Sequence, residues 1–100
     1  MPVLDLNNPE FQRQLVALDK HERHAVISAI GKLLTLDWHA LHRHSGFNWE
    51  EIKEREVRGP NGETLNSLRV TQKMRLVGYR NGHTLVLLSL HPDHDSAYGR

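Results

Sequence analysis

The segment LNSLRVTQKMRLVGYRNGHTLVLLSLHP, residues 65–92, decides the fold, because it joins two strand patterns through a turn signal. Residues 65–80 are predicted to form one long strand and residues 84–92 a second. Asn81-Gly82 between them is the strongest short signal for a β-hairpin. The apolar run at 85–90 predicts a central strand that is buried on both faces. Pro92 ends this strand, because proline cannot donate a hydrogen bond to the ladder.

Two helices are predicted ahead of the hairpin. Asn8 in the cap position and Pro9 in the first helical position start one helix, and the spacing of the apolar residues that follow is helical. Asp19 and Glu22 have the spacing of a capping box at the start of a second helix. The apolar stripe of that helix consists of Ala25, Val26, Ala29, Ile30, Leu33 and Leu34. Each helix has one apolar face, which the sheet must cover.

Together these elements predict an α+β fold, with a two-helix hairpin packed on one face of a small, mostly antiparallel sheet. Residues 1–100 are expected to form a single domain. A short strand is expected at 3–6, a loop at 37–46, a strand at 48–57 and a turn at 58–64. Trp38 and Trp49 are expected at the edge of the core.

The composition excludes several classes of protein. Thirteen basic and 12 acidic residues leave a net charge of +1, so total charge does not indicate a nucleic-acid binder. The absence of cysteine excludes a disulfide scaffold, a cysteine zinc site and a cysteine nucleophile. No apolar stretch approaches the ~18 residues of a membrane span, and the N-terminus lacks the features of a signal peptide. We therefore expect a soluble cytoplasmic protein with no membrane partner.

The predicted long strand carries its charges on one side. Alternate residues point to opposite sides of a strand. One side carries Arg69, Thr71, Lys73 and Arg75, and the other carries mostly Leu68, Val70, Met74 and Leu76. With the apolar side against the helices, three cations lie beside the end of the next strand. A bulge near Gly78 could reverse this alternation, and a solvated strand face without function is the structural alternative.

In its order of elements, the chain resembles the RelE/ParE superfamily of bacterial toxins. The residues that carry the resemblance are SLRV at 67–70, MRL at 74–76 and HPDHDSAY at 91–98. The resemblance implies a microbial-ribonuclease-like fold, with a curved sheet and two helices on one side. It also implies a toxin of a type II toxin–antitoxin system, an endoribonuclease that inhibits translation by cutting mRNA in the ribosome.

The same resemblance implies the position of the active site. Carried onto matching positions, the cleaving residues are Arg69 and Arg75 on the strand and His94, Asp95 and Tyr98 in the tail. His91 is the alternative to His94, and Lys73 and His91 are predicted RNA contacts. The implied partners are a cognate antitoxin and mRNA on the ribosome.

RNA cleavage by internal transfer needs a base for the 2′-hydroxyl, cations for the phosphorane and an acid for the leaving 5′-oxygen. Histidine suits the first or third role because its pKa lies near neutral pH, and arginine suits the second because its planar fork matches phosphate. We expect Arg75 to clamp the phosphate, Arg69 to be a second cation and His94 to be the acid or base. Asp95 would orient a histidine, and Tyr98 would stack on a base or position the nucleophile. The chemistry requires no metal or other cofactor.

Other interpretations compete with this one. The arginines could pair with Glu50, Glu51 or Glu54 across the sheet, although Glu50 or Glu51 is also a reserve candidate for the general base. Metal ligands occur in residues 91–95 and at His39, His42 and His44, but neither group has a standard zinc spacing. ParE-like relatives poison DNA gyrase on the same fold, and an inert relative would have no activity, so the fold alone does not select the target.

Overall fold

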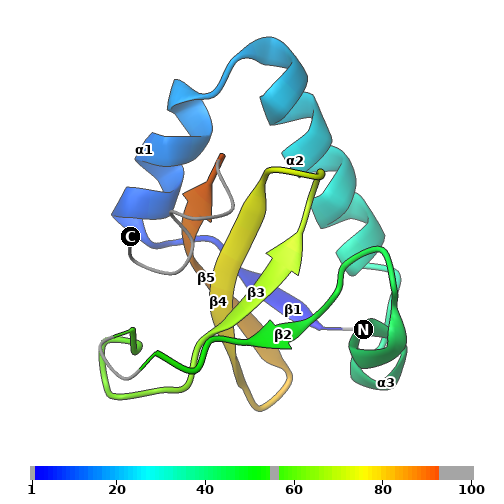
Figure 1. Ribbon diagram of the computed structural model, residues 1–100, viewed down its shortest axis with the longest axis vertical. Helices are drawn as coiled ribbons and strands as arrows, with labels where there is room; N and C mark the ends of the chain where they lie inside the picture. The colour runs from blue at the N-terminus through cyan, green and yellow to red at the C-terminus, as the bar shows by residue number, and fades with distance from the viewer. Residues whose placement is uncertain (1, 55–56, 93–100) are drawn as a thin grey trace.

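A mixed sheet with helices packed on it forms the architecture of the protein (Figure 1). The computed structural model describes residues 2–54 and 57–92. Within these residues the strands are β1 (Val3–Asp5), β2 (Glu50–Glu51), β3 (Asn66–Arg69), β4 (Arg75–Asn81) and β5 (Thr84–His91). They lie in the order β1-β5-β4-β3-β2, with β1 parallel to β5 and the other neighbours antiparallel. The predicted α+β class and mostly antiparallel sheet are confirmed.

The two predicted helices are present as α1 (Pro9–Ala17) and α2 (Lys20–Leu33). The Asn8 side chain caps α1 by accepting hydrogen bonds from the backbone N–H groups of Glu10 and Phe11. Asp19 and Glu22 form both hydrogen bonds of the predicted capping box at the start of α2. Local sequence signals therefore set where both helices begin.

A further helix, α3 (Trp38–Arg43), occupies the segment predicted as a loop. That prediction is wrong because Asp37 is a helix cap, whose carboxylate accepts a hydrogen bond of 2.7 Å from the backbone N–H of Ala40. Trp38 and Leu41 are buried one turn apart and hold the short helix against the core. Tertiary burial therefore stabilises a helix that is too short to be stable alone.

The apolar sides of the helices and one face of the sheet form a single core. Its buried members are Phe11, Leu18, Val26, Ala29, Leu33, Trp38, Leu41, Phe47, Leu68, Met74, Leu76, Leu85, Leu87 and Leu90. Burial of these side chains is the main stabilising contribution to the fold. It also fixes the orientation of the sheet, so that the residues alternating with the core positions point to the opposite side, which we call the open face.

The segment predicted as one long strand is in fact a hairpin of β3 and β4. The chain reverses between Val70 and Met74, where the backbone N–H of Val70 donates to the carbonyl of Met74 at 2.9 Å. The hydroxyl of Thr71 accepts hydrogen bonds from the backbone N–H groups of Lys73 and Met74. The Thr71 side chain thus satisfies backbone N–H groups that would otherwise pair with a neighbouring strand. Residue alternation alone, which predicted one continuous strand, does not reveal such a local turn.

The strand β5 is buried on one face and not on both, in contrast to the prediction. Leu85, Leu87 and Leu90 are buried, whereas the residues that alternate with them are half-buried. The register shifts between Val77 and Gly78, so the bulge that the sequence left open is present. Because of this bulge, buried positions in β5 change from odd to even numbers along the strand.

The predicted turn between β4 and β5 is confirmed, but its two loop residues are one position later than the predicted Asn81-Gly82. Asn81 pairs with Thr84, so the two loop residues are Gly82 and His83. Gly82 has a positive φ of 63°. Glycine in the first loop position is the signature of a type II′ turn, which matches the twist of the flanking strands.

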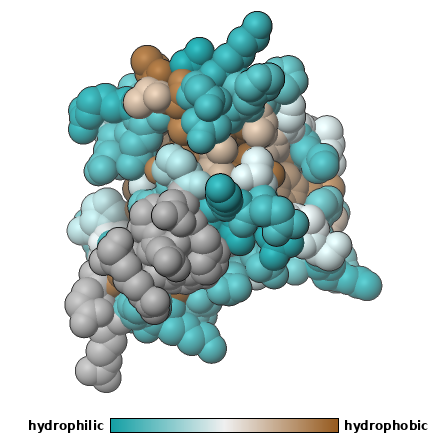
Figure 2. Space-filling model, turned by 45° about the horizontal axis from the view of Figure 1, so that its top comes forward, coloured by the Kyte–Doolittle hydropathy of each residue, from teal (hydrophilic) through white to brown (hydrophobic). Residues whose placement is uncertain are grey.

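A small second cluster covers part of the open face. Ile52, Leu65 and Val77 are buried there, against the half-buried Val57, Tyr79 and Leu88. Of the predicted strand at 48–57, only β2 pairs with a neighbour in the described residues. The surface in Figure 2 is mostly hydrophilic, with apolar side chains in gaps between polar ones. None of the described helices is long and apolar enough to span a membrane.

Candidate active site on the open face

Three of the predicted site residues lie in one row across the open face. Arg69 on β3 pairs with Arg75 on β4, and Arg75 pairs with His91 on β5. Directly paired residues in a sheet project from the same face, with Cβ atoms about 4.5–5.5 Å apart. We call Arg69, Arg75 and His91 the cross-strand row. The turn and the bulge together bring these side chains to one end of the sheet.

Arg75 is held in place by the turn between β3 and β4. Its side chain is only 7% exposed. One terminal nitrogen donates hydrogen bonds to the carbonyl oxygens of Thr71 and Met74 at 2.8 and 3.1 Å, and to that of Gln72 at 3.3 Å. The guanidinium therefore caps the turn. The same contacts fix a permanent positive charge within the cross-strand row.

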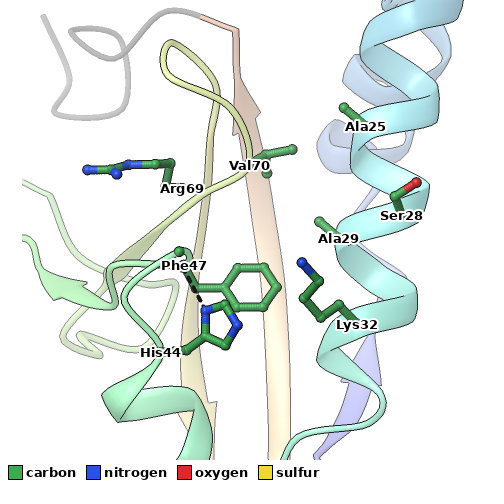
Figure 3. A pocket seen from close by; sticks show the side chains of 9 residues that line it. Ala25, Ser28, Ala29, Lys32, His44, Phe47, Arg69 and Val70 are labelled. Atoms are coloured by element: carbon green, nitrogen blue, oxygen red, sulfur yellow. Dashed lines mark hydrogen bonds between the residues drawn. The ribbon is translucent and has the colours of Figure 1, made fainter.

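Arg69 has a buried donor that the described residues do not satisfy. Its backbone N–H donates to the carbonyl of Phe47 at 2.6 Å, but its buried Nε has no hydrogen-bond partner among the described residues. The side chain points away from α2 (Figure 3). A buried polar group without a partner is costly. The positive charge of Arg69 therefore lies on the open face with its Nε buried and without a partner among the described residues.

His91 is coupled to a serine on its own strand. Its Nε2 lies 2.8 Å from the hydroxyl oxygen of Ser89. Burial lowers the pKa of His91 from its ordinary value of 6.5, and the negative charge of Glu10 partly opposes this effect. The imidazole is therefore mostly neutral at neutral pH, the state that a general base requires. The sequence alone does not reveal Ser89, because the face on which it lies depends on the bulge beside Gly78.

The other predicted residues lie apart from this row or outside the described chain. Lys73 is exposed in the turn between β3 and β4 and is not part of the row. His94, Asp95 and Tyr98 fall in residues 93–100, outside the described residues. Glu50, a reserve carboxylate, pairs with Ser67, two residues along β3 from Arg69, and so projects from the open face. The structure thus brings together Arg69, Arg75 and His91, with Glu50 nearby.

The described residues include no group of three or more His, Cys, Asp or Glu side chains that could hold a metal ion. The histidines in and after α3 have separate partners. His39 Nε2 lies 3.2 Å from Arg43, the ring of His42 lies 5.3 Å from that of Trp49, and His44 Nδ1 accepts from the backbone N–H of Phe47. Because His39, His42 and His44 do not point toward a common centre, they do not form a shared metal site.

A pocket of about 350 Å³ lies on the other side of β3, beside α2 (Figure 3). Ala25, Ser28, Ala29 and Lys32 of α2 face the segment 44–47 across it, with Val70 at one end. Lys32 and Arg69 are its cationic lining residues. Arg69 of the cross-strand row lines the pocket, but Arg75 and His91 do not, so the pocket is the weaker candidate for catalysis.

Comparison with known proteins adds information about the fold. No protein-family model and no curated protein matches this sequence. The chain is similar to the crystal structure of a copper-bound mutant toxin from Helicobacter pylori, with a TM-score of 0.52 and 21% sequence identity. The match covers 96% of this chain and 98% of the other. At this identity the likeness establishes a shared fold over nearly the whole chain.

Proposed function

We propose that the protein is the toxin of a type II toxin–antitoxin system and acts as a metal-independent mRNA endoribonuclease on the ribosome. The observation that carries the proposal is the cross-strand row, in which two arginines and a half-buried histidine share one end of a sheet face. The fold shared with a bacterial toxin supports it. The target would place the protein in the cytoplasm.

The proposed reaction is an internal transfer at one phosphodiester. His91, or Glu50 in its place, takes the proton of the 2′-hydroxyl, and the 2′-oxygen attacks phosphorus. The guanidinium charges of Arg69 and Arg75 stabilise the phosphorane. The bond to the 5′-oxygen then breaks, leaving a 2′,3′-cyclic phosphate and a protonated 5′-hydroxyl. His94 is the proposed acid, and Asp95 and Tyr98 are the proposed positioning residues in the tail.

A toxin of this kind needs an antitoxin that covers the open face in the host cell. The proposed partner is a protein whose acidic side chains reach the cross-strand row, because Arg69 and Arg75 present positive charge there. Lys73, exposed in the adjacent turn, is a proposed contact to RNA phosphates. Removal of the partner would free the row to bind RNA.

Induced expression in a bacterial host tests the proposal. Growth and protein synthesis are measured for the wild type, Arg69→Ala and His91→Ala, with Arg13→Ala on the exposed side of α1 as the matched control. We expect growth arrest with halted translation for the wild type and the control, and relief by both row variants. The row variants must remain soluble and folded by circular dichroism.

The same experiment separates the alternatives. Arrest with intact translation and accumulating DNA breaks would indicate a gyrase poison, as in ParE-like toxins. Absence of arrest from soluble wild-type protein would indicate an inert relative. Arrest that neither row variant relieves would show that the cross-strand row is not the active site.

A further inference from the structure

A cluster of aromatic and cationic side chains surrounds α3, away from the cross-strand row. The rings of Trp38 and Trp49 meet edge to face at 5.6 Å, and His42 lies 5.7 Å from Trp38 and 5.3 Å from Trp49. The guanidinium carbon of Arg80 lies 4.3 Å from the centre of the Trp38 ring. We call Trp38, His42, Trp49 and Arg80 the stacking cluster.

Hydrogen bonds to the β4–β5 loop hold part of the stacking cluster in place, and other side chains of the cluster are exposed to solvent. Trp38 is only 7% exposed, and its Nε1–H donates to the carbonyl of His83 at 3.2 Å. Arg80 is exposed, but its Nε donates to the carbonyl of Gly82 at 2.9 Å and its charge lies over Trp38. His42 is exposed and Trp49 is half-buried. The exposed rings and guanidinium are therefore preorganised, which lowers the entropic cost of binding a planar ligand.

The α3 side of the stacking cluster favours a negatively charged ligand, whereas Glu50 and Glu51 are exposed on the side of β2. The exposed side chains of α3 include His39, His42 and Arg43, and the helix itself contains no acidic residue. Its capping residue, Asp37, has its carboxylate engaged by the backbone of Ala40. Aromatic faces combined with cations are the means by which proteins bind unpaired bases and the phosphates between them.

The packing of α3 against the core does not explain why His42 and Trp49 also lie in the stacking cluster. Trp38 and Leu41 supply the buried contacts of the helix. The exposed His42 adds little burial, yet its ring stands beside two tryptophans. Trp49 packs against the helix-facing core, while the next residue, Glu50, projects from the open face. The stacking cluster and the proposed active site therefore lie on opposite faces of the sheet at β2, with the exposed side chains of Glu50 and Glu51 between them.

We propose that the stacking cluster binds unpaired bases of single-stranded RNA, with Arg43 and Arg80 contacting the flanking phosphates. This inference rests on the proposed function, and it identifies a part of the RNA-binding surface that lies outside the cross-strand row. Bases stack on the exposed faces of His42, Trp49 and Arg80. Stacking tolerates any base, so the site contributes affinity and not sequence preference.

Tryptophan fluorescence tests the inference directly, because the only two tryptophans of the chain both belong to the stacking cluster. The probe is a fully 2′-O-methylated single-stranded RNA oligonucleotide, which cannot be cleaved by internal transfer. We expect it to quench the emission of the wild-type protein, with an affinity that falls as salt is added. The double variant His42→Ala/Arg43→Ala should bind about tenfold more weakly.

The matched control is His24→Ala/Arg13→Ala, which removes the same residue types from exposed helical positions elsewhere. It should bind like the wild type, and Arg80→Gln should weaken binding as the double variant does. RNA that binds by fluorescence anisotropy without quenching, or quenching that the variants leave unchanged, would overturn the inference. Failure to bind this RNA at all would also overturn it. Growth arrest and mRNA cleavage by the same proteins are read separately and report on the proposed function alone.

Discussion

At the scale of single residues, the two arginines of the cross-strand row are predicted to differ in what they contribute to stability. Arg75 donates to three carbonyl oxygens, so Arg75→Met should lower the free energy of unfolding by about 1.5–3 kcal/mol. The buried Nε of Arg69 has no hydrogen-bond partner among the described residues, so Arg69→Leu should stay within about 0.5 kcal/mol of the wild type while losing activity. Urea denaturation measures both. Equal losses in the two variants would contradict this assignment.

The pKa of His91 predicts a pH dependence of stability. Burial lowers this pKa in the folded protein below the ordinary value of 6.5. The unfolded chain then binds more protons than the folded chain at mildly acidic pH. The contribution of neutral His91 to the free energy of unfolding should therefore be complete above pH 6.5. It should be lost as the pH falls from 6.5 through the lower pKa of the folded state.

Denaturation at pH 7.5 and 5.0 checks this prediction. His91→Gln, which keeps a polar group near Ser89, should lose less stability than the wild type on acidification. His21→Gln on the exposed surface of α2 is the control for the other histidines and should behave like the wild type. An unchanged pH dependence in His91→Gln would show that His91 is not the group responsible.

At the scale of elements, the bulge between β4 and β5 depends on Gly78. A Cβ at this position would lie 2.2 Å from the carbonyl oxygen of Val86, closer than real atoms approach. Gly78→Ala should therefore destabilise the protein by about 1–3 kcal/mol and displace His91 from the cross-strand row. Gly31→Ala in α2 meets nothing within 4 Å and should stabilise by about 0.5–1 kcal/mol. Thermal unfolding of both variants, with activity beside it, measures the contrast.

The elements also show which features local sequence could predict. The caps at Asn8 and Asp19 act within four residues, so the sequence alone located α1 and α2. The reversal after Arg69 depends on the Thr71 hydroxyl, and α3 depends on burial of Trp38 against distant segments. Periodicity could not reveal either feature. It still placed Arg69 and Arg75 on one face, because residues separated by an even number lie on the same face of a single strand. In the structure they share a face for a different reason, since the hairpin pairs them directly.

At the scale of the whole molecule, the cross-strand row could be predicted only in part. The choice of Arg69 and Arg75 followed from residue type and family resemblance. His91, the predicted alternative to His94, pairs with Arg75 in the sheet, and its role in catalysis stays a prediction. The role of Ser89 and the face of His91 depend on a register shift that no local pattern encodes. The net charge of +1 gave no indication of the row, since the cations gather on the open face without changing the total.

The shared core predicts that residues 1–100 unfold as one domain. The helix-facing core includes residues of α1, α2, α3 and three strands, and the second cluster uses β4 and β5 as well. Elements that share buried side chains lose them together, so unfolding should be a single cooperative transition. The tryptophans Trp38 and Trp49 report the α3 end, whereas far-ultraviolet circular dichroism reports all helices and strands.

Urea transitions followed by the two signals should therefore coincide in midpoint and slope. Leu68→Ala, which truncates a fully buried side chain on β3, should shift both transitions together and cost about 2–5 kcal/mol. Val16→Ala is the matched control, because Val16 is 74% exposed and its loss should change neither. A tryptophan transition that precedes the loss of circular dichroism would show that α3 and the stacking cluster unfold separately. In that case RNA binding at α3 should raise the first transition and leave the second unchanged.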